Sequence, residues 1–125
     1  MLTSKSGPKP GESAGLWMIK LLTGFLIIII LGIHLTVNHM LGSANGLLTQ
    51  QEVVEYYSKW IVPFMEILFL VFVVSHSLIG TRSIILDLNP SKSTLKVLDW
   101  LFIIIGSGYV IYGIWLVIKI VQLGL

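Results

Sequence analysis

Three long apolar segments constrain this chain more than any other feature. The chain has 125 residues, and we place the segments at about 16–40, 60–86 and 96–122. Each exceeds the ~20 residues that a helix needs to cross ~30 Å of hydrocarbon. Only 11% of the residues are charged, whereas soluble domains carry roughly 25%. The sequence therefore predicts an all-α integral membrane fold of three transmembrane helices.

The rest of the chain divides into a tail and two connections. Residues 1–15 are polar and rich in Gly, Pro and Ser, which predicts a flexible tail before a transmembrane domain at 16–125. The first apolar segment is too long for a signal peptide and lacks a convincing cleavage site, so we keep it as a span. In the connection at 41–59, Thr49 and Glu52 have the spacing of a capping box. In the connection at 87–95, Asn89-Pro90 ends the second helix.

The basic residues near the span ends predict the orientation. Six lie on one side and two on the other, namely Lys5, Lys9, Lys20, Arg82, Lys92 and Lys96 against Lys59 and Lys119. The positive-inside rule then places the N-terminus in the cytoplasm and the C-terminus outside. The basic residues are scattered and the net charge is only +2, which argues against a nucleic-acid partner.

Histidine is the side chain left for binding a metal. The chain has no cysteine, which excludes disulfides, thiolate metal sites and covalent haem attachment through C-x-x-C-H. The three histidines are His34, His39 and His76. Nor does the sequence contain a nucleotide-binding loop or paired carboxylates in a cleft, so the task expected of this chain is binding and positioning.

The stretch 71–88 places four polar or small residues on one helix face. At about 100° per residue, His76, Gly80, Ser83 and Asp87 form one narrow stripe. Such a stripe could form one side of a large planar ligand. His76 lies near mid-membrane, where it either ligates haem iron through its neutral imidazole or hydrogen-bonds across a helix interface. The space at Gly80 favours the haem interpretation.

Other polar residues of the spans could contact a ligand or make structural hydrogen bonds. Arg82 could pair with a haem propionate or a quinone carbonyl, or it could reach lipid phosphates. The depths of His34 and His76 in the membrane differ by ~11 Å, at a rise of 1.5 Å per residue. The two histidines are therefore not expected to bind the same iron unless the helices tilt strongly, which makes two haems possible, each completed by a histidine from another subunit. We expect His39 to make an interfacial hydrogen bond, and Asn38 to orient His34.

Some polar and small residues of the second and third helices are expected to be structural. Glu66 and Lys119 lie at similar depth, which predicts an ion pair. Gly106, Gly113 and Tyr109 are expected to share a face of the third helix, where small residues allow close helix packing.

The motif H-x-x-x-G-x-R-x-x-x-x-D at 76–87 resembles the signature of the cytochrome b membrane anchors of succinate dehydrogenase (succinate:quinone oxidoreductase, respiratory complex II). Thr23-Gly24, followed ten residues later by His34, resembles the S-G…H arrangement of three-span bacterial and archaeal anchors. The K-W-x-x-P-F sequence at 59–64 is also similar to the family. With three spans and a short tail, the resemblance covers nearly the whole chain.

This resemblance implies a D-type anchor in a prokaryotic cytoplasmic (inner) membrane. Its expected partners are a second membrane anchor subunit, an iron–sulfur subunit, a flavoprotein subunit and membrane lipids. Its expected cofactor is haem b, one or two copies, with quinone as substrate. Position by position, the resemblance makes His76 and His34 axial iron ligands, with Arg82, Ser83 and Gly80 beside the cofactor.

Two departures move part of the quinone site elsewhere. Leu88 stands where some anchors have a tyrosine that contacts quinone, and the His-Arg-x-Ser-Gly pattern of many partner anchors is absent, with Lys20 the nearby cation. Much of the quinone site is therefore expected on partner subunits. The alternatives are a haem-free anchor that only docks the soluble subunits, and a scaffold subunit of an unrelated complex. A transporter is disfavoured because the spans show no internal repeat and little polar lining.

Overall fold

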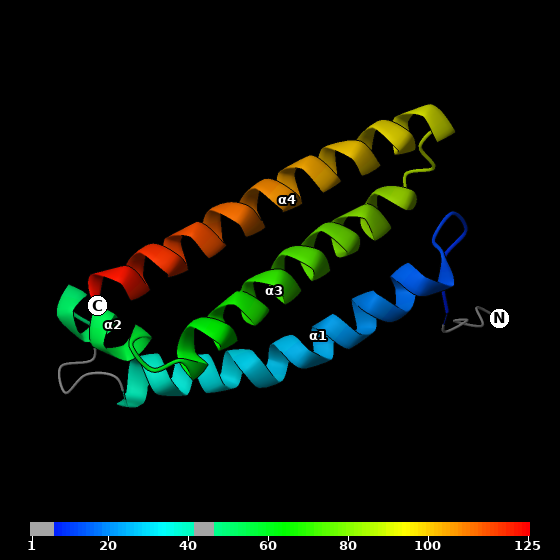
Figure 1. Cartoon of the computed structure of the whole chain (residues 1–125). Coiled ribbons are helices and arrows are strands. Elements are labelled where there is room, and N and C mark those ends of the chain that lie inside the picture. The colour runs from blue at the N-terminus through cyan, green and yellow to red at the C-terminus, as the bar shows by residue number, and fades with distance from the viewer. Residues whose placement is uncertain (1–6, 42–46) are drawn as a thin grey trace.

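A computed structural model describes residues 7–41 and 47–125 of the chain. In order, the elements are α1 (Ala14–Leu35), its π-helical extension η1 (Thr36–Leu41), α2 (Gln50–Tyr57), α3 (Ile61–Leu86) and α4 (Lys92–Leu123). Figure 1 shows α3 lying between α1 and α4, with the short α2 beside the C-terminal end of α4. We call the end where α1 begins and α3 meets α4 the loop end, and the opposite end the α2 end. The all-α fold is as predicted.

The three long helices are long and apolar enough to cross a membrane. They cover Ala14–Met40, Ile61–Leu86 and Lys92–Leu123, with 27, 26 and 32 residues. Two begin slightly earlier than predicted because serines cap them. The Ser13 hydroxyl accepts from the Leu16 N–H at 3.2 Å, and the Ser91 hydroxyl accepts from the Thr94 N–H at 3.1 Å. Such caps satisfy N–H groups that have no partner inside a helix.

Both connections have the local structure that the sequence predicts. Thr49 Oγ1 accepts from the Glu52 N–H at 3.3 Å, and the Glu52 carboxylate accepts from the Thr49 N–H at 2.7 Å, which is the predicted capping box. After α3, Asn89 adopts a φ of 49°, a left-handed conformation that asparagine tolerates better than most residues. The described residues do not include 1–6, among them Lys5, or 42–46 of the first connection.

Close packing between α3 and α4 depends on two glycines of α4. A Cβ on Gly106 would lie 2.6 Å from Leu78 Cδ1, and a Cβ on Gly113 would collide with Leu70. The predicted small-residue contact is therefore confirmed for the glycines. Tyr109, which we expected on the same face, is instead 63% exposed, because its longer side chain points out of the bundle.

Very little apolar surface is buried within the chain. Among the described residues, Val62 and Val117 are the buried hydrophobic side chains, while Ile28 on α1 and Ile111 on α4 are 72% and 68% exposed. A water-soluble domain buries such side chains. The outer faces of this bundle therefore need lipid or other protein chains around them.

Candidate functional site

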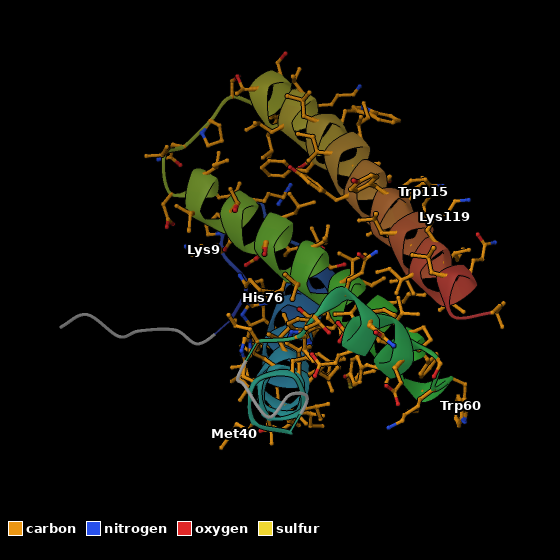
Figure 2. The ribbon with its side chains drawn as sticks, turned by 90° about the vertical axis from the view of Figure 1, so that its left-hand side faces the viewer. Lys9, Met40, Trp60, His76, Trp115 and Lys119 are labelled. Atoms are coloured by element: carbon orange, nitrogen blue, oxygen red, sulfur yellow. The ribbon has the colours of Figure 1, made fainter. Side chains whose placement is uncertain are left out.

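The polar stripe of α3 faces α1 and the segment that precedes it. Figure 2 shows His76 between the ribbons of α3 and α1, with Lys9 close to the far end of α3. The predicted stripe is therefore a real face of the helix, but its polar groups contact residues of the same chain.

His76 contacts one turn of α1. Its Nδ1 lies 3.0 Å from the backbone carbonyl oxygen of Lys20 and 3.4 Å from the Thr23 hydroxyl. A carbonyl can only accept, so Nδ1 carries the proton and donates to it. In the neutral imidazole the remaining nitrogen, Nε2, then keeps its lone pair, which is the state that a metal ligand requires.

The His76 ring also requires glycine on the neighbouring helix. A Cβ on Gly24 would lie 2.9 Å from Cε1 of His76 and 3.8 Å from Nε2. Gly80, one turn after His76, is different, because a Cβ there would meet nothing within 4 Å. The space that the sequence predicts at Gly80 therefore exists, while Gly24 is the residue that admits the histidine ring.

The remaining members of the stripe bind lysines. Ser83 is buried, with 6% of its surface exposed, and its hydroxyl accepts from Lys20 Nζ at 2.9 Å. The Asp87 carboxylate accepts from Lys9 Nζ at 2.7 Å. The Ser83 hydroxyl therefore already has a partner within the chain.

Arg82 binds an acidic residue of α4 that sequence reasoning missed. Its Nε donates to Asp99 Oδ1 at 2.6 Å and its Nη2 donates to Oδ2 at 3.2 Å. This two-pronged geometry suits guanidinium and carboxylate. Asp99 is the single acidic residue of α4. Its position near the loop end, opposite Arg82, is the sequence signal that could have predicted this pair.

A groove opens between α3 and α4 beside this ion pair. Its volume is about 690 Å³, and Arg82 and Asp99 contribute to its lining with Ser75, Ser107 and apolar side chains. The groove thus combines mostly apolar walls with a small number of charged and hydroxyl groups. That combination suits a ligand with an apolar body and a polar head.

His34 forms a second polar cluster at the α2 end. Its Nδ1 lies 2.9 Å from Glu66 Oε1, and its ring lies 5.2 Å from the Phe69 ring, measured between centroids. The Asn38 amide nitrogen lies 3.1 Å from Nδ1 and 3.2 Å from Nε2. When Nδ1–H donates to the carboxylate, Nε2 accepts from the amide. The predicted contact between Asn38 and His34 is confirmed.

The expected ion pair between Glu66 and Lys119 is wrong. Glu66 faces α1, where His34 binds it. Lys119 lies over the Trp115 ring at 5.9 Å from the centroid, and Figure 2 shows both residues on the outer side of α4. Matching depth was a poor guide, because Lys119 lies on the outer side of α4 while the Glu66 carboxylate binds His34 of α1.

The two histidine clusters lie at different levels, as predicted. Glu66 and His76 are ten residues apart on α3, which is ~15 Å at 1.5 Å per residue. His39 is exposed on η1. Within residues 7–41 and 47–125, no three His, Asp or Glu side chains gather in a way that could hold a bare metal ion.

Fold and site together define an integral membrane subunit. Its three spans expose apolar faces, carry the Arg82–Asp99 ion pair and the His34–Glu66 hydrogen bond between helices, and place two histidines at separate depths.

Comparison with known families identifies this subunit. The sequence matches the family model of the succinate dehydrogenase/fumarate reductase transmembrane subunit over residues 6–113, most of the chain. The chain belongs to this family. No curated protein and no solved structure matches the chain.

Proposed function

We propose that this chain anchors the soluble subunits of a succinate:quinone oxidoreductase to a prokaryotic cytoplasmic membrane, ligates haem b and lines part of a quinone site. The observation that carries the proposal is the hydrogen bond from His76 Nδ1 to the Lys20 carbonyl at 3.0 Å. It assigns the proton to Nδ1 and leaves the lone pair of Nε2 for iron. Family membership supplies the enzyme complex in which such a ligand has a use.

The partners would be a second membrane anchor subunit, an iron–sulfur subunit and a flavoprotein subunit. The exposed apolar faces of the chain support a second set of membrane helices beside it, because three helices alone bury so little surface. The soluble subunits would bind at the loop end, where the positive-inside rule places the cytoplasm. A D-type anchor in this position would itself carry out no dehydrogenation.

His76 and the residues around it would hold the haem ligand in one orientation. The Lys20 carbonyl fixes the tautomer, and the carbonyl dipole makes the imidazole a better electron donor. The open space beside Gly80 would accommodate a flat group along α3. Bound haem b would supply one-electron redox chemistry between the iron–sulfur subunit and quinone.

His34 would ligate a second haem in a di-haem complex. Its Nδ1 already donates to the Glu66 carboxylate, and a carboxylate partner raises the basicity of a ligating imidazole. The Asn38 amide, 3.2 Å from Nε2, would have to turn away before that nitrogen could bind iron. His34 is therefore the weaker of the two proposed ligands.

Quinone would enter the groove between α3 and α4. The apolar walls suit an isoprenoid tail, and the Arg82 guanidinium at one end of the groove could donate to a quinone carbonyl. Because Arg82 also holds Asp99, it would be kept in place without depending on the ligand. The partner subunits would supply the rest of the quinone site.

A second candidate is an anchor that carries no haem. It is favoured by the packing of the His76 ring against Gly24 and by the engagement of both His34 ring nitrogens. In this case both histidines would join α1 to α3, and the chain would dock the soluble subunits and shape a quinone pocket.

A reduced-minus-oxidised spectrum of the purified complex tests the proposal, with haem quantified per flavin. The variants are His76→Ala and His34→Ala, and His39→Ala is the matched control because His39 is exposed on η1. We expect a b-type signal in the wild type that His76→Ala removes and His39→Ala retains. Loss of a separate signal in His34→Ala would assign the second haem.

The spectrum also separates the two candidates. A wild-type complex that contains flavin but no b-type signal would leave the haem-free anchor. A signal that survives His76→Ala would contradict the assignment of His76.

A further inference from the structure

The segment before α1 crosses the loop end of α3 and is bound there. We call residues 9–13 the strap. Lys9 Nζ donates to the Asp87 carboxylate at 2.7 Å and to the Ser83 carbonyl at 3.4 Å. Arg82 Nη1 donates to the Gly11 carbonyl at 3.3 Å. Figure 2 shows Lys9 beside this end of α3. The strap therefore contacts the same helix that carries His76.

Glu12 is the buried residue of the strap. Its side chain is 2% exposed, and its Oε1 accepts from Lys20 Nζ at 2.6 Å. Its Oε2 accepts from the backbone N–H of Lys9 at 3.2 Å. A buried carboxylate is stable only with such partners. Burial alone would raise the pKa of the Glu12 carboxyl, but the bonds to Lys20 and Lys9 hold it below its usual value.

Lys20 connects the strap to His76. Its ammonium group binds Glu12 and the Ser83 hydroxyl, and its carbonyl accepts from His76 Nδ1. With 18% of its side chain exposed, the ammonium depends on Glu12 for its opposite charge. Glu12 and Ser83 together hold this turn of α1 against α3 at the level where the histidine ring packs.

We propose that Glu12 is a positioning residue for His76, acting through Lys20. This inference rests on the proposed role of His76 as a ligand, and it goes beyond it by assigning a function to the strap. Without the Glu12 carboxylate, the Lys20 ammonium would be an unpaired charge at the edge of the membrane. Moving it toward water would pull on the first turns of α1 and weaken the bond from His76 to the Lys20 carbonyl.

The test measures the His76 Nδ1–H directly in the assembled complex. With ¹⁵N-histidine labelling and dithionite reduction, the Nδ1–H signal is assigned by its loss in His76→Gln, and its exchange with solvent is followed. We expect Glu12→Gln to accelerate this exchange about threefold to tenfold, as loss of one hydrogen bond would. Glu55→Gln is the matched control, because Glu55 is an exposed carboxylate on α2.

Two further variants distinguish positioning from general loss of stability. Lys20→Met combined with Glu12→Gln removes the unpaired charge, so we expect exchange slower than in Glu12→Gln alone. Glu12→Asp keeps the charge, and we expect its Nδ1–H exchange rate to lie between those of wild type and Glu12→Gln. This variant preserves the test if Glu12→Gln does not assemble. Unchanged exchange in Glu12→Gln, or no slowing in the double variant, would overturn the proposal.

The same samples separate this inference from the proposed function. Absence of a b-type spectrum in the wild type would contradict the haem assignment, while the Nδ1–H exchange would still decide the role of Glu12. Where haem is present, Glu12→Gln is expected to raise its midpoint potential, since a negative charge is lost near the ligand. A potential equal to that of Glu55→Gln would count against the proposal.

Discussion

At the scale of single residues, the described polar groups inside the spans are bound mainly by other groups of this chain. His76 binds a backbone carbonyl, Arg82 binds Asp99, and His34 binds Glu66. The hydrocarbon core supplies no hydrogen-bond partners, so an unpaired group there costs several kcal/mol or more. Each of these side chains therefore joins two helices as well as offering a functional group.

We expect the packing of the His76 ring against α1 to require glycine at position 24. The change Gly24→Ala would place a methyl group 2.9 Å from the imidazole, and such overpacking costs about 1–3 kcal/mol. Gly32→Ala is the matched control on the same helix, because a Cβ there meets nothing within 4 Å. Thermal unfolding of the complex in detergent measures both. Equal midpoints for the two variants would contradict the tight contact.

The pair of His34 and Glu66 is expected to be energetically coupled. Replacing one partner by Leu leaves a buried polar group without its bond, whereas replacing both leaves none. A double-mutant cycle on the free energy of unfolding should then give a coupling of at least ~0.5 kcal/mol. The same cycle on Glu66 and Lys119 should be additive. Coupling in the second cycle and not in the first would contradict the observed pairing.

At the scale of elements, two different contacts hold the three helices together. The α3–α4 contact is apolar at Gly106 and Gly113 and ends in the Arg82–Asp99 ion pair at the loop end. The contact of α3 with α1 and the strap includes the polar bonds of His76, Ser83 and Asp87. A polar contact responds to pH, whereas an apolar one does not.

The strap is expected to detach in acid. The pKa of Glu12 is lowered from 4.5 because its bonds to Lys20, Lys9 and Ser83 outweigh the effect of burial. A lowered pKa means that the stabilisation is complete above pH 4.5 and is lost as the pH falls further.

A spin label at Pro8→Cys, an exposed position, measures this release by its mobility. We expect an immobile label at pH 7 that becomes mobile below pH 4.5, and a mobile label at both pH values in Glu12→Gln. A label that is equally mobile at pH 7 in both proteins would contradict the attachment.

At the scale of the whole molecule, the bundle is one part of a larger membrane assembly. Its helices form a row with α3 in the middle (Figure 1), and its outer faces are apolar. Membership in the succinate dehydrogenase/fumarate reductase transmembrane family explains why such a small chain exposes so much apolar surface. Lipid and the other subunits of the complex would cover it.

The orientation of the bundle can be measured because the chain has no cysteine of its own. Gln51→Cys on α2 and Ser93→Cys at the start of α4 place single thiols at opposite ends, both at exposed positions. We expect a membrane-impermeant maleimide to label Gln51→Cys in intact cells and Ser93→Cys only after permeabilisation. The reverse pattern would place the N-terminus outside.

Much of the fold could be predicted because long apolar helices have few alternatives in a membrane. The three spans, the capping box at Thr49 and Glu52, and the stop at Asn89-Pro90 each depend on neighbouring residues in the chain. The candidate site was predicted less completely. His76, Gly80 and Ser83 were correctly placed on one face, but their partners were not found, because Lys20 and Glu12 lie more than fifty residues away.

The sequence by itself determined the spans, their caps, the polar face of α3 and the two histidine levels, since these follow from local periodicity and from depth in the bilayer. Tertiary structure alone decided which polar groups meet. Glu66 binds His34 and not Lys119, Arg82 binds Asp99, and Glu12 folds back onto Lys20. Depth is one coordinate of a transmembrane residue. The other is the rotation of its helix about the helix axis, which packing at Gly24, Gly106 and Gly113 sets.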